Sequence, residues 1–294
     1  MKKGLILINA YSKLESSLNQ SKRLKEELEK LGVAVDILRN DFFAAKLDGL
    51  GNIVTKAEGY DFCIYLDKDR YISHMLEKSG LKLFNSHTAI EACDDKMLTS
   101  ITLANSGIPM PKTLAGLLCY DEGAEIGEQF YKNIESEIGY PVIVKTCYGS
   151  LGKGVFKADN REQLEKLANR LKCTPHLFQQ FIKTSEGRDI RVIVIGGKAV
   201  AAMVRKSDGD FRSNLELGGT AQAYNPPEEV ISLCERTANL LNLDYCGIDI
   251  LFGEKGYCIC EVNSNAFFGG IERATNINIA KAYSEYIYST VYIK

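Results

Sequence analysis

The pattern of apolar and polar positions divides the first part of the chain into short strands and amphipathic helices. Residues 5–9 form a short apolar run typical of a buried strand, and 16–31 carry leucines at helical spacing until Gly32. Further strands are expected at 33–38, 62–66 and 81–84, and a helix at 72–79. Strands that alternate with helices predict an α/β domain that ends near residue 90.

The pattern changes after this domain. Residues 89–105 have a helical pattern that stops at Ser106-Gly107, before Pro109 and Pro111, which a helix interior does not accept. A second unit follows, with strands expected at 141–147, 155–158 and 177–182 and a helix at 161–171. A third unit has hairpins at 191–205, around Gly196-Gly197, and at 246–263, closed by 253–255, with a helix at 227–241 between them.

These units suggest an α/β (α+β) protein with domains at 1–90, 91–185 and 186–294. The 294 residues suggest two domains at roughly 150 residues each, but one large or three small domains also fit. Apolar residues make up 45% and charged residues 25% of the chain, which is typical of globular proteins. The net charge of -2 leads us to expect no nucleic-acid partner.

The sequence also bears on cellular location. The longest apolar stretches fall far short of the roughly 20 residues that span a bilayer, so no membrane association is expected. The N-terminal apolar run breaks at Asn9 without a signal-peptide cleavage site, which favours a cytoplasmic protein. Nine cysteines are scattered along the chain, and the lone Cys258-x-Cys260 pair is a poor zinc site. We expect reduced, mostly buried thiols.

The last hairpin carries the sharpest chemical signal. If it is symmetric about Lys255, Asp249 lies directly opposite Glu261, and Asn263 shares the face of Glu261. Facing carboxylates repel unless a cation or a proton lies between them. Oxygen ligands of this kind suit Mg²⁺ or Mn²⁺. The alternative is an exposed hairpin with solvated acids. On the first interpretation, either acid could be replaced without loss of the fold.

A glycine-rich turn is the second signal. Residues 149–154 read Gly-Ser-Leu-Gly-Lys-Gly and lie between two expected strands, the first of which carries Lys145. Backbone N–H groups of such a turn can hold phosphate oxygens. The turn matches neither the dinucleotide fingerprint nor the P-loop. A flexible hairpin tip is an equally good interpretation.

The remaining polar signals are weaker. Residues 210–214 read Asp-Phe-Arg-Ser-Asn and lie near several arginines, which suits phosphate or carboxylate binding, although a solvated loop is the alternative. His74, His87 and His176 show no triad spacing, and the last two are interpreted as capping or surface residues. Cys147 has no nearby base and is interpreted as structural.

Read in order, these pieces resemble the ATP-grasp superfamily, and within it the RimK-type glutamate ligases. The resemblance is closest over 178–279, in the motifs 179–182, 187–191 and 201–203 and the run 209–219, and it extends upstream through Asp95-Lys96, 107–113 and 141–145. It implies an ATP-grasp fold with an N-terminal α/β pre-ATP-grasp domain, a central domain and a C-terminal domain.

The resemblance also implies a set of site residues. The residues that would contact ATP are Lys96, Lys145, Gly149, Ser150, Gly152, Gly154, Gln180, Phe181, Ile182 and Asp189, the lysines and the turn at the phosphates, 180–182 at adenine and Asp189 near the ribose. The residues that would hold Mg²⁺ or Mn²⁺ are Asp249, Glu261 and Asn263. Arg212 and Asn214 would face the transferred phosphoryl group as catalytic residues.

Two departures from the family pattern stand out. Gln180 replaces a common acid, which matters little where backbone groups hold the base. After Asn263, the usual Ser-Pro-Gly is replaced by Asn265-Ala266-Phe267, which changes the expected substrate. We expect 265–270 to select the substrate, with one of the rings Phe267 and Phe268 facing away from the core.

The resemblance predicts an ATP-dependent carboxylate-amine ligase that works through an acylphosphate. It would add an amino acid such as glutamate to a protein, peptide or small-molecule acceptor. An ATP-binding regulatory module without ligase activity is the alternative, and an RNA-associated factor agrees less well with the net charge of -2. The sequence leaves the oligomeric state open, a homo-oligomer included.

Overall fold

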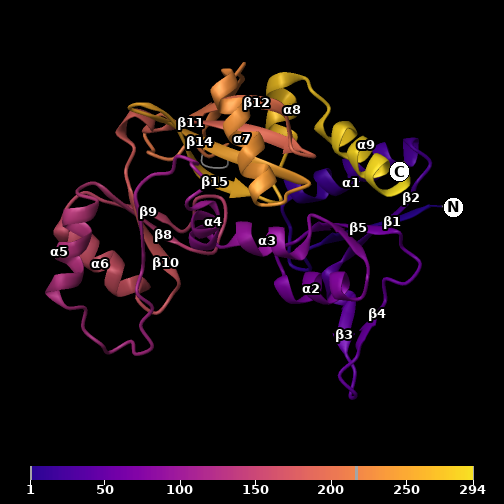
Figure 1. The fold of residues 1–294 in the computed structure, drawn as a ribbon, viewed down its shortest axis with the longest axis horizontal. Coiled ribbons are helices and arrows are strands. Elements are labelled where there is room, and N and C mark those ends of the chain that lie inside the picture. The colour runs from indigo at the N-terminus through magenta and orange to yellow at the C-terminus, as the bar shows by residue number, and fades with distance from the viewer. Residues whose placement is uncertain (1, 216–217, 294) are drawn as a thin grey trace.

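Three larger sheets, one two-stranded hairpin and the helices around them make up the part of the chain that the structure describes. The computed structural model describes residues 2–215 and 218–293. In Figure 1, the central unit with α5 and α6 lies at one end, the five-stranded C-terminal sheet lies in the middle, and the N-terminal sheet lies at the other end beside both termini. Within the described part of the chain, no helix combines the length and the apolar character needed to cross a membrane.

The N-terminal sheet is parallel and has the order β2-β1-β5-β6. Its strands are β1 (Lys3–Ile8), β2 (Ala34–Arg39), β5 (Phe62–Leu66) and β6 (Lys82–Phe84), and its helices are α1 (Glu15–Lys30) and α2 (Arg70–Lys78). The expected elements are thus confirmed to within two residues at each end. The hairpin of β3 (Ala45–Leu47) and β4 (Ile53–Thr55) was not expected, and it projects away from the rest of the protein (Figure 1).

The helix expected at 89–105 is two helices, α3 (His87–Asp94) and α4 (Lys96–Leu103). Asp95 between them has an extended backbone, and its carboxylate accepts the N–H groups of Met97 and Leu98 as an N-cap. The backbone N–H of Lys96 donates to the Cys147 carbonyl at 3.1 Å. Asp95 therefore caps a new helix whose first residue, Lys96, is bonded to the central unit.

The central unit is an antiparallel sheet with the order β7-β10-β8-β9. Its strands are β7 (Thr113–Ala115), β8 (Val142–Thr146), β9 (Val155–Ala158) and β10 (His176–Gln180), covered by α5 (Glu128–Glu137) and α6 (Arg161–Leu171), with the short helix η2 (Lys183–Ser185) after β10. Helix α6 has the predicted bounds, whereas α5 and β7 were not predicted.

The C-terminal sheet is antiparallel, with the order β13-β12-β11-β14-β15. Its strands are β11 (Arg188–Ile195), β12 (Lys198–Lys206), β13 (Thr220–Ala223), β14 (Tyr245–Gly253) and β15 (Gly256–Asn263), and its helices are α7 (Glu228–Leu240), α8 (Gly269–Thr275) and α9 (Ile279–Tyr292). Both predicted hairpins are confirmed. Glu216 and Leu217, in the run 209–219, lie outside the described residues.

The hydrophobic cores follow the three units only in part. The central unit has a core of its own. The largest cluster instead combines Ile6 and Leu24 of the N-terminal unit with Tyr245, Phe268 and Tyr283 of the C-terminal unit. The two outer units therefore share apolar contacts. A further cluster packs residues 89–110 against the C-terminal sheet, so only the sheet of the central unit, with α5 and α6, has a separate core. The division at residues 90 and 185 stays an interpretation.

The interpretation of His87 and His176 as capping or surface residues was wrong, because Ser86 is the N-cap of α3 and His176 begins β10. His87 is only 6% exposed and His176 only 2% exposed, so neither is a surface residue. His87 is the first residue of α3 and stacks on His74, with ring centroids 4.2 Å apart. His176 packs edge-on against Phe178 inside the central unit.

Candidate active site

The pairing of β14 with β15 places the two acids predicted to bind metal opposite each other. Asp249 pairs with Glu261 and Gly247 with Asn263, so the three predicted ligands share one face. The hairpin axis was predicted wrongly, because Gly253 pairs with Gly256 across a two-residue loop. A β-bulge between Asp249 and Ile250, with Cys260 as the extra residue, restores the predicted pairing.

Asp249 is embedded among arginines. Both of its carboxylate oxygens accept from Arg191, and Arg205 Nη2 lies 2.9 Å from Oδ2. Burial alone would raise the pKa of Asp249, but Arg191 and Arg205 outweigh it and hold the pKa below its ordinary value. A carboxylate offers about four lone-pair sites, and these contacts leave Oδ1 the freer oxygen.

Asp189 belongs to the same network. Arg205 Nε donates to Asp189 Oδ1 at 2.8 Å, and its Nη2 donates to Oδ2. Asp189 is 7% exposed, and both of its oxygens are engaged by the guanidinium. The ribose contact implied for Asp189 stays a prediction. In this arrangement the Asp189 carboxylate accepts hydrogen bonds from Arg205.

Glu261 is more accessible and faces Lys96. Lys96 Nζ lies 3.6 Å from Glu261 Oε1 and donates to the Gly149 carbonyl at 2.9 Å. The N-terminus of α4 therefore places one ammonium group between the predicted metal ligands and the glycine-rich turn. Contacts of this kind fit a lysine that meets the phosphates of a nucleotide.

Lys145 reaches the same strand from β8. It is 6% exposed, and its ammonium group lies 3.6 Å from Cys260 Sγ. Desolvation raises the pKa of the Cys260 thiol, and Lys145 opposes this shift. The thiol therefore stays protonated at neutral pH, and Lys145 has no carboxylate partner among the described residues.

The glycine-rich turn lines a pocket together with Lys96 and Glu261. Its backbone has positive φ at Gly149 (125°), Leu151 (59°) and Gly152 (72°), and a Cβ at Gly154 would come within 2.0 Å of Thr146 Oγ1. The pocket is lined by Lys96, Thr146, Gly149, Ser150, Gly152, Gly154, Val155 and Glu261. The structure thus brings the predicted turn, lysine and acid together.

Arg212 bridges the turn and the C-terminal unit. Its guanidinium donates to the Gly152 carbonyl at 2.7 Å and to both oxygens of Asp210. The hydrogen bonds that Arg212 donates to Asp210 raise the pKa of Arg212. Asn214 lies two residues further, and its carbonyl accepts the N–H of Gly219. Arg212 is therefore beside the pocket, as a group meeting a phosphoryl oxygen would be.

The residues predicted to hold adenine lie elsewhere. Gln180 ends β10, and its N–H donates to the Lys112 carbonyl at 2.8 Å. The Phe181 ring packs edge-on against Phe211, and the Ile182 carbonyl accepts from Ser185. None of the three, nor Asp189, lines the pocket at the glycine-rich turn or the neighbouring pocket beside α4. Their roles stay predictions.

A second pocket adjoins Lys96 and contains residues that were not predicted. It is lined by Lys96, Thr99, Ser100, Leu103, Met110, Gln179, Ile259, Cys260, Glu261 and Val262. Positions 96, 99, 100 and 103 follow the helical spacing of one face of α4. That spacing could have identified the α4 residues from the sequence, because Lys96 was already a candidate.

The chemistry of the predicted metal ligands fits Mg²⁺. Two carboxylates and one amide are the oxygen donors that Mg²⁺ prefers, and Mn²⁺ accepts the same set. Glu261 and the free side of Asp249 Oδ1 are the available donors. Within residues 2–215 and 218–293, no three His, Cys, Asp or Glu side chains are grouped for metal binding, so the amide of Asn263 is needed to complete this set.

Comparison with known proteins assigns the family. Residues 93–287 match the family model described as the RimK-like ATP-grasp domain. The chain belongs to the RimK-like ATP-grasp family. The ATP-grasp fold agrees with a solved relative, the RimK domain protein ATP-grasp from Sphaerobacter thermophilus, at a TM-score of 0.72 and 17% identity over 97% of this chain and 99% of that chain.

Two relatives of this RimK-like ATP-grasp chain have informative names. Beta-citrylglutamate synthase B of Homo sapiens is 37% identical over 225 residues, which are 75% of this chain and 56% of the human protein. A protein of Maridesulfovibrio salexigens named probable alpha-L-glutamate ligase is 34% identical over 219 residues, 74% of this chain and 70% of that protein. The match thus spans little more than half of the human relative.

Proposed function

We propose that this chain is an ATP-dependent carboxylate-amine ligase that works through an acylphosphate. The observation that carries the proposal is that Lys96, Glu261 and the turn at 149–154 line one pocket together. Arg212 is bonded to that turn. Cations and backbone N–H groups from the central and C-terminal units converge where phosphates would lie. Family membership over residues 93–287 supports the same assignment.

The proposed reaction needs no protein nucleophile. A carboxylate oxygen of one substrate attacks the γ-phosphorus of ATP, the bond to the ADP oxygen breaks, and an acylphosphate forms. The nitrogen of an amine then attacks the acyl carbon and loses a proton, and inorganic phosphate leaves. Phosphoryl transfer of this kind depends on positioning and on positive charge around the phosphoryl oxygens.

The basic residues around the pocket and the turn that lines it each have a role in this proposal. Lys96 and Lys145 neutralise phosphate charge from two sides, and the turn donates backbone N–H groups and covers the phosphates. Arg212 and Asn214 meet the phosphoryl group from the C-terminal unit. The turn also excludes water, which would otherwise hydrolyse the acylphosphate before the amine attacks.

Asp249, Glu261 and Asn263 would hold Mg²⁺, or Mn²⁺ in its place. When bound, the metal supplies positive charge to the transferring phosphoryl group. Arg191 and Arg205 hold the Asp249 carboxylate in its ionised form and fix its position. Glu261 moves away from Lys96 in this proposal, because the ammonium and the metal compete for the same oxygen.

For the substrates, we propose an amino acid such as glutamate and a protein, peptide or small-molecule partner. The names of the relatives in Homo sapiens and M. salexigens both contain glutamate, which supports glutamate as one substrate. The odd number of cysteines, nine, scattered along the chain, supports a reducing compartment such as the cytoplasm.

The test is a coupled assay on the pure protein. It is incubated with ATP, Mg²⁺ and pools of amino acids, peptides and di- or tricarboxylates, and ADP and product mass are measured together. Lys145→Met keeps the side-chain size and removes the charge, so ADP formation should fall at least about 100-fold. Lys46→Met, at an exposed position on β3, is the matched control. ADP release without any new product mass would contradict ligation.

A further inference from the structure

The segment after the last predicted metal ligand, residues 264–270, is held by side chains on the side that faces the N-terminal unit. Asn85 Nδ2 donates to the Ser264 carbonyl at 2.8 Å. Gln20 Nε2 lies 3.4 Å from both Asn265 Oδ1 and the Ala266 carbonyl. Two residues of the N-terminal unit thus contact three consecutive positions of this segment.

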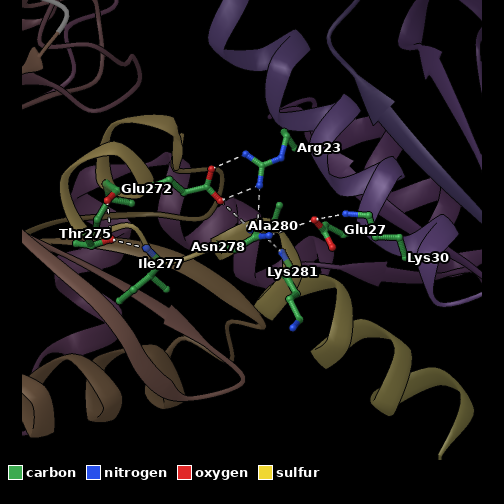
Figure 2. Close-up of polar contacts among 10 residues, drawn as sticks. Arg23, Glu27, Lys30, Glu272, Thr275, Ile277, Asn278, Ala280 and Lys281 are labelled. Atoms are coloured by element: carbon green, nitrogen blue, oxygen red, sulfur yellow. Dashed lines mark hydrogen bonds and ion pairs between the residues drawn. The ribbon is translucent and has the colours of Figure 1, made fainter.

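Gln20 lies on α1, and α1 also contacts α8, which begins at Gly269 within the segment. Figure 2 shows Arg23 of α1 between Glu272 of α8 and Asn278, the N-cap of α9. Its Nη1 donates to Glu272 Oε2 at 2.7 Å, and its Nη2 donates to Asn278 Oδ1 at 2.9 Å. Helix α1 therefore contacts residues 264–270 at their start and α8 just beyond their end.

Gln20 is an unusual residue for this place. It is 3% exposed, and its Oε1 is buried with no hydrogen-bond partner among the described residues. An apolar side chain of the same size would fill the space without an unpaired acceptor. The feature that sets Gln20 apart from such a side chain is the N–H donor that it directs at Asn265 and Ala266.

The other side of the segment contacts the loop that carries Arg212 and Asn214. A Cβ at Gly270 would come within 2.8 Å of Leu215 Cδ1, and Leu215 follows Asn214 directly. The segment therefore lies between α1 and the loop of Arg212 and Asn214. Gln20 itself lines neither of the two pockets around Lys96, and its amide contacts the segment at Asn265 and Ala266.

We propose that Gln20 is a positioning residue that selects the acceptor by fixing Asn265 and Ala266. This inference rests on the proposed ligase function and adds α1 of the N-terminal unit to the substrate-selecting part of the site. Gln20 touches neither ATP nor the reacting atoms. It acts through residues 264–270, whose position sets the space beside Asn263.

The experiment compares Gln20→Met with Ser21→Ala. Methionine keeps the size and removes the amide, whereas Ser21, the adjacent buried position on α1, bonds only the Leu18 carbonyl of its own helix. Michaelis constants for ATP and for the acceptor are measured separately. Gln20→Met should raise the acceptor constant about fivefold, the effect of losing one ordinary hydrogen bond, and should leave the ATP constant within twofold.

Hydrogen exchange followed by mass spectrometry provides a readout that does not need activity. Amides of residues 264–270 should exchange several-fold faster in Gln20→Met, while those of the turn at 149–154 should keep their rates. Ser21→Ala should change neither. An unchanged acceptor constant with unchanged exchange would overturn the proposal, as would equal increases for ATP and acceptor together with lower thermal stability.

The two hypotheses can fail separately. If the wild-type protein forms no product with any acceptor, the ligase function is wrong, and the acceptor role of Gln20 is wrong with it. Exchange at 264–270 still decides whether Gln20 holds the segment. If the wild-type protein ligates and Gln20→Met keeps its acceptor constant, only the role of Gln20 is wrong.

Discussion

Arg205 links Asp189 to Asp249 in the interior of the C-terminal sheet. Its Nε donates to Asp189 Oδ1 at 2.8 Å, and its Nη2 lies 2.9 Å from Asp249 Oδ2. The three residues are 5–7% exposed, and the two acids raise the pKa of Arg205 above its ordinary value against the effect of burial. Asp249 therefore balances buried positive charge as well as facing Glu261.

This network changes the expected result of removing Asp249. The sequence predicted an intact fold, because two facing acids would be relieved of repulsion. Asp249→Ala instead leaves Arg191 without its carboxylate and Arg205 with only one, which should destabilise the protein by about 3–5 kcal/mol. Calorimetry should show a fall in Tm on the order of 10 °C.

Glu261→Gln provides the contrast. The Glu261 side chain is 26% exposed, and its one ion pair among the described residues is with Lys96 at 3.6 Å, so its loss should change stability by less than about 1 kcal/mol. ATP turnover should nevertheless be lost, since this is the more available of the two predicted metal-binding carboxylates. Full turnover in Glu261→Gln would show that the metal assignment is wrong.

The cysteines should differ in reactivity by burial. Cys173 is exposed, whereas Cys93, Cys234 and Cys258 are buried, and burial raises the pKa of each of these three to about 12. Native protein should therefore react with a maleimide first at Cys173. Denatured, unreduced protein should yield a thiol count that approaches nine, and a count lower by several in anaerobic samples would reveal disulfides.

His87 should make the N-terminal unit sensitive to mild acid. Its Nδ1 lies 3.2 Å from Ser73 Oγ, and its ring stacks on His74. Burial, and then His74, lower the pKa of His87, although Glu91 and Glu77 oppose them. The folded state thus binds fewer protons at His87 than the unfolded state does. The stability that His87 contributes is therefore fully present above its unfolded pKa of about 6.5, and it is lost as the pH falls through its lower pKa in the folded protein.

Urea unfolding at pH 8, 7, 6 and 5 checks this prediction. The unfolding free energy should decrease from pH 7 to pH 5 in the wild-type protein, and His87→Gln should reduce the decrease. His176 is also buried, at 2% exposed, and His176→Gln provides a matched control in the central unit. A wild-type curve that is flat over this range would contradict the assignment.

The sequence predicted local pattern well and tertiary adjustments poorly. Helix α6 was predicted with its observed bounds, because a cap, an amphipathic stripe and a break all coincide there. The break at Asp95 was missed, since no Gly or Pro marks it and the first residue of the new helix, Lys96, is bonded to the Cys147 carbonyl. Periodicity cannot reveal a hydrogen bond to a residue fifty positions away.

The candidate site shows the same division. The pairing of Asp249 with Glu261 was predicted, but through a wrong hairpin axis that the bulge at Cys260 compensates. A bulge depends on the surrounding sheet and has no clear mark in the sequence. The arginines around Asp249 were seen only as nearby positive charge, because strand register across β11, β12 and β14 decides which acid each one meets.

The two adjacent rings after the predicted metal ligands should separate stability from substrate choice. Phe268 is 2% exposed and belongs to the largest core cluster, whereas Phe267 is only partly buried. One ring therefore faces away from the core, as predicted. Phe268→Ala should destabilise the protein by about 3–5 kcal/mol through loss of buried area and the cavity left behind.

Phe267→Ala should leave the unfolding free energy nearly unchanged, because little of its contact is with the core. It should instead raise the Michaelis constant for the acceptor or change which acceptor is used, since an aromatic ring beside a reacting centre contacts apolar or planar parts of a ligand. The constant for ATP should stay within twofold, and Phe267→Leu, which keeps apolar bulk, should fall between wild type and alanine. If Phe267→Ala weakens ATP binding while acceptor preference stays the same, then residues 265–270 belong to the nucleotide site and not to the acceptor site.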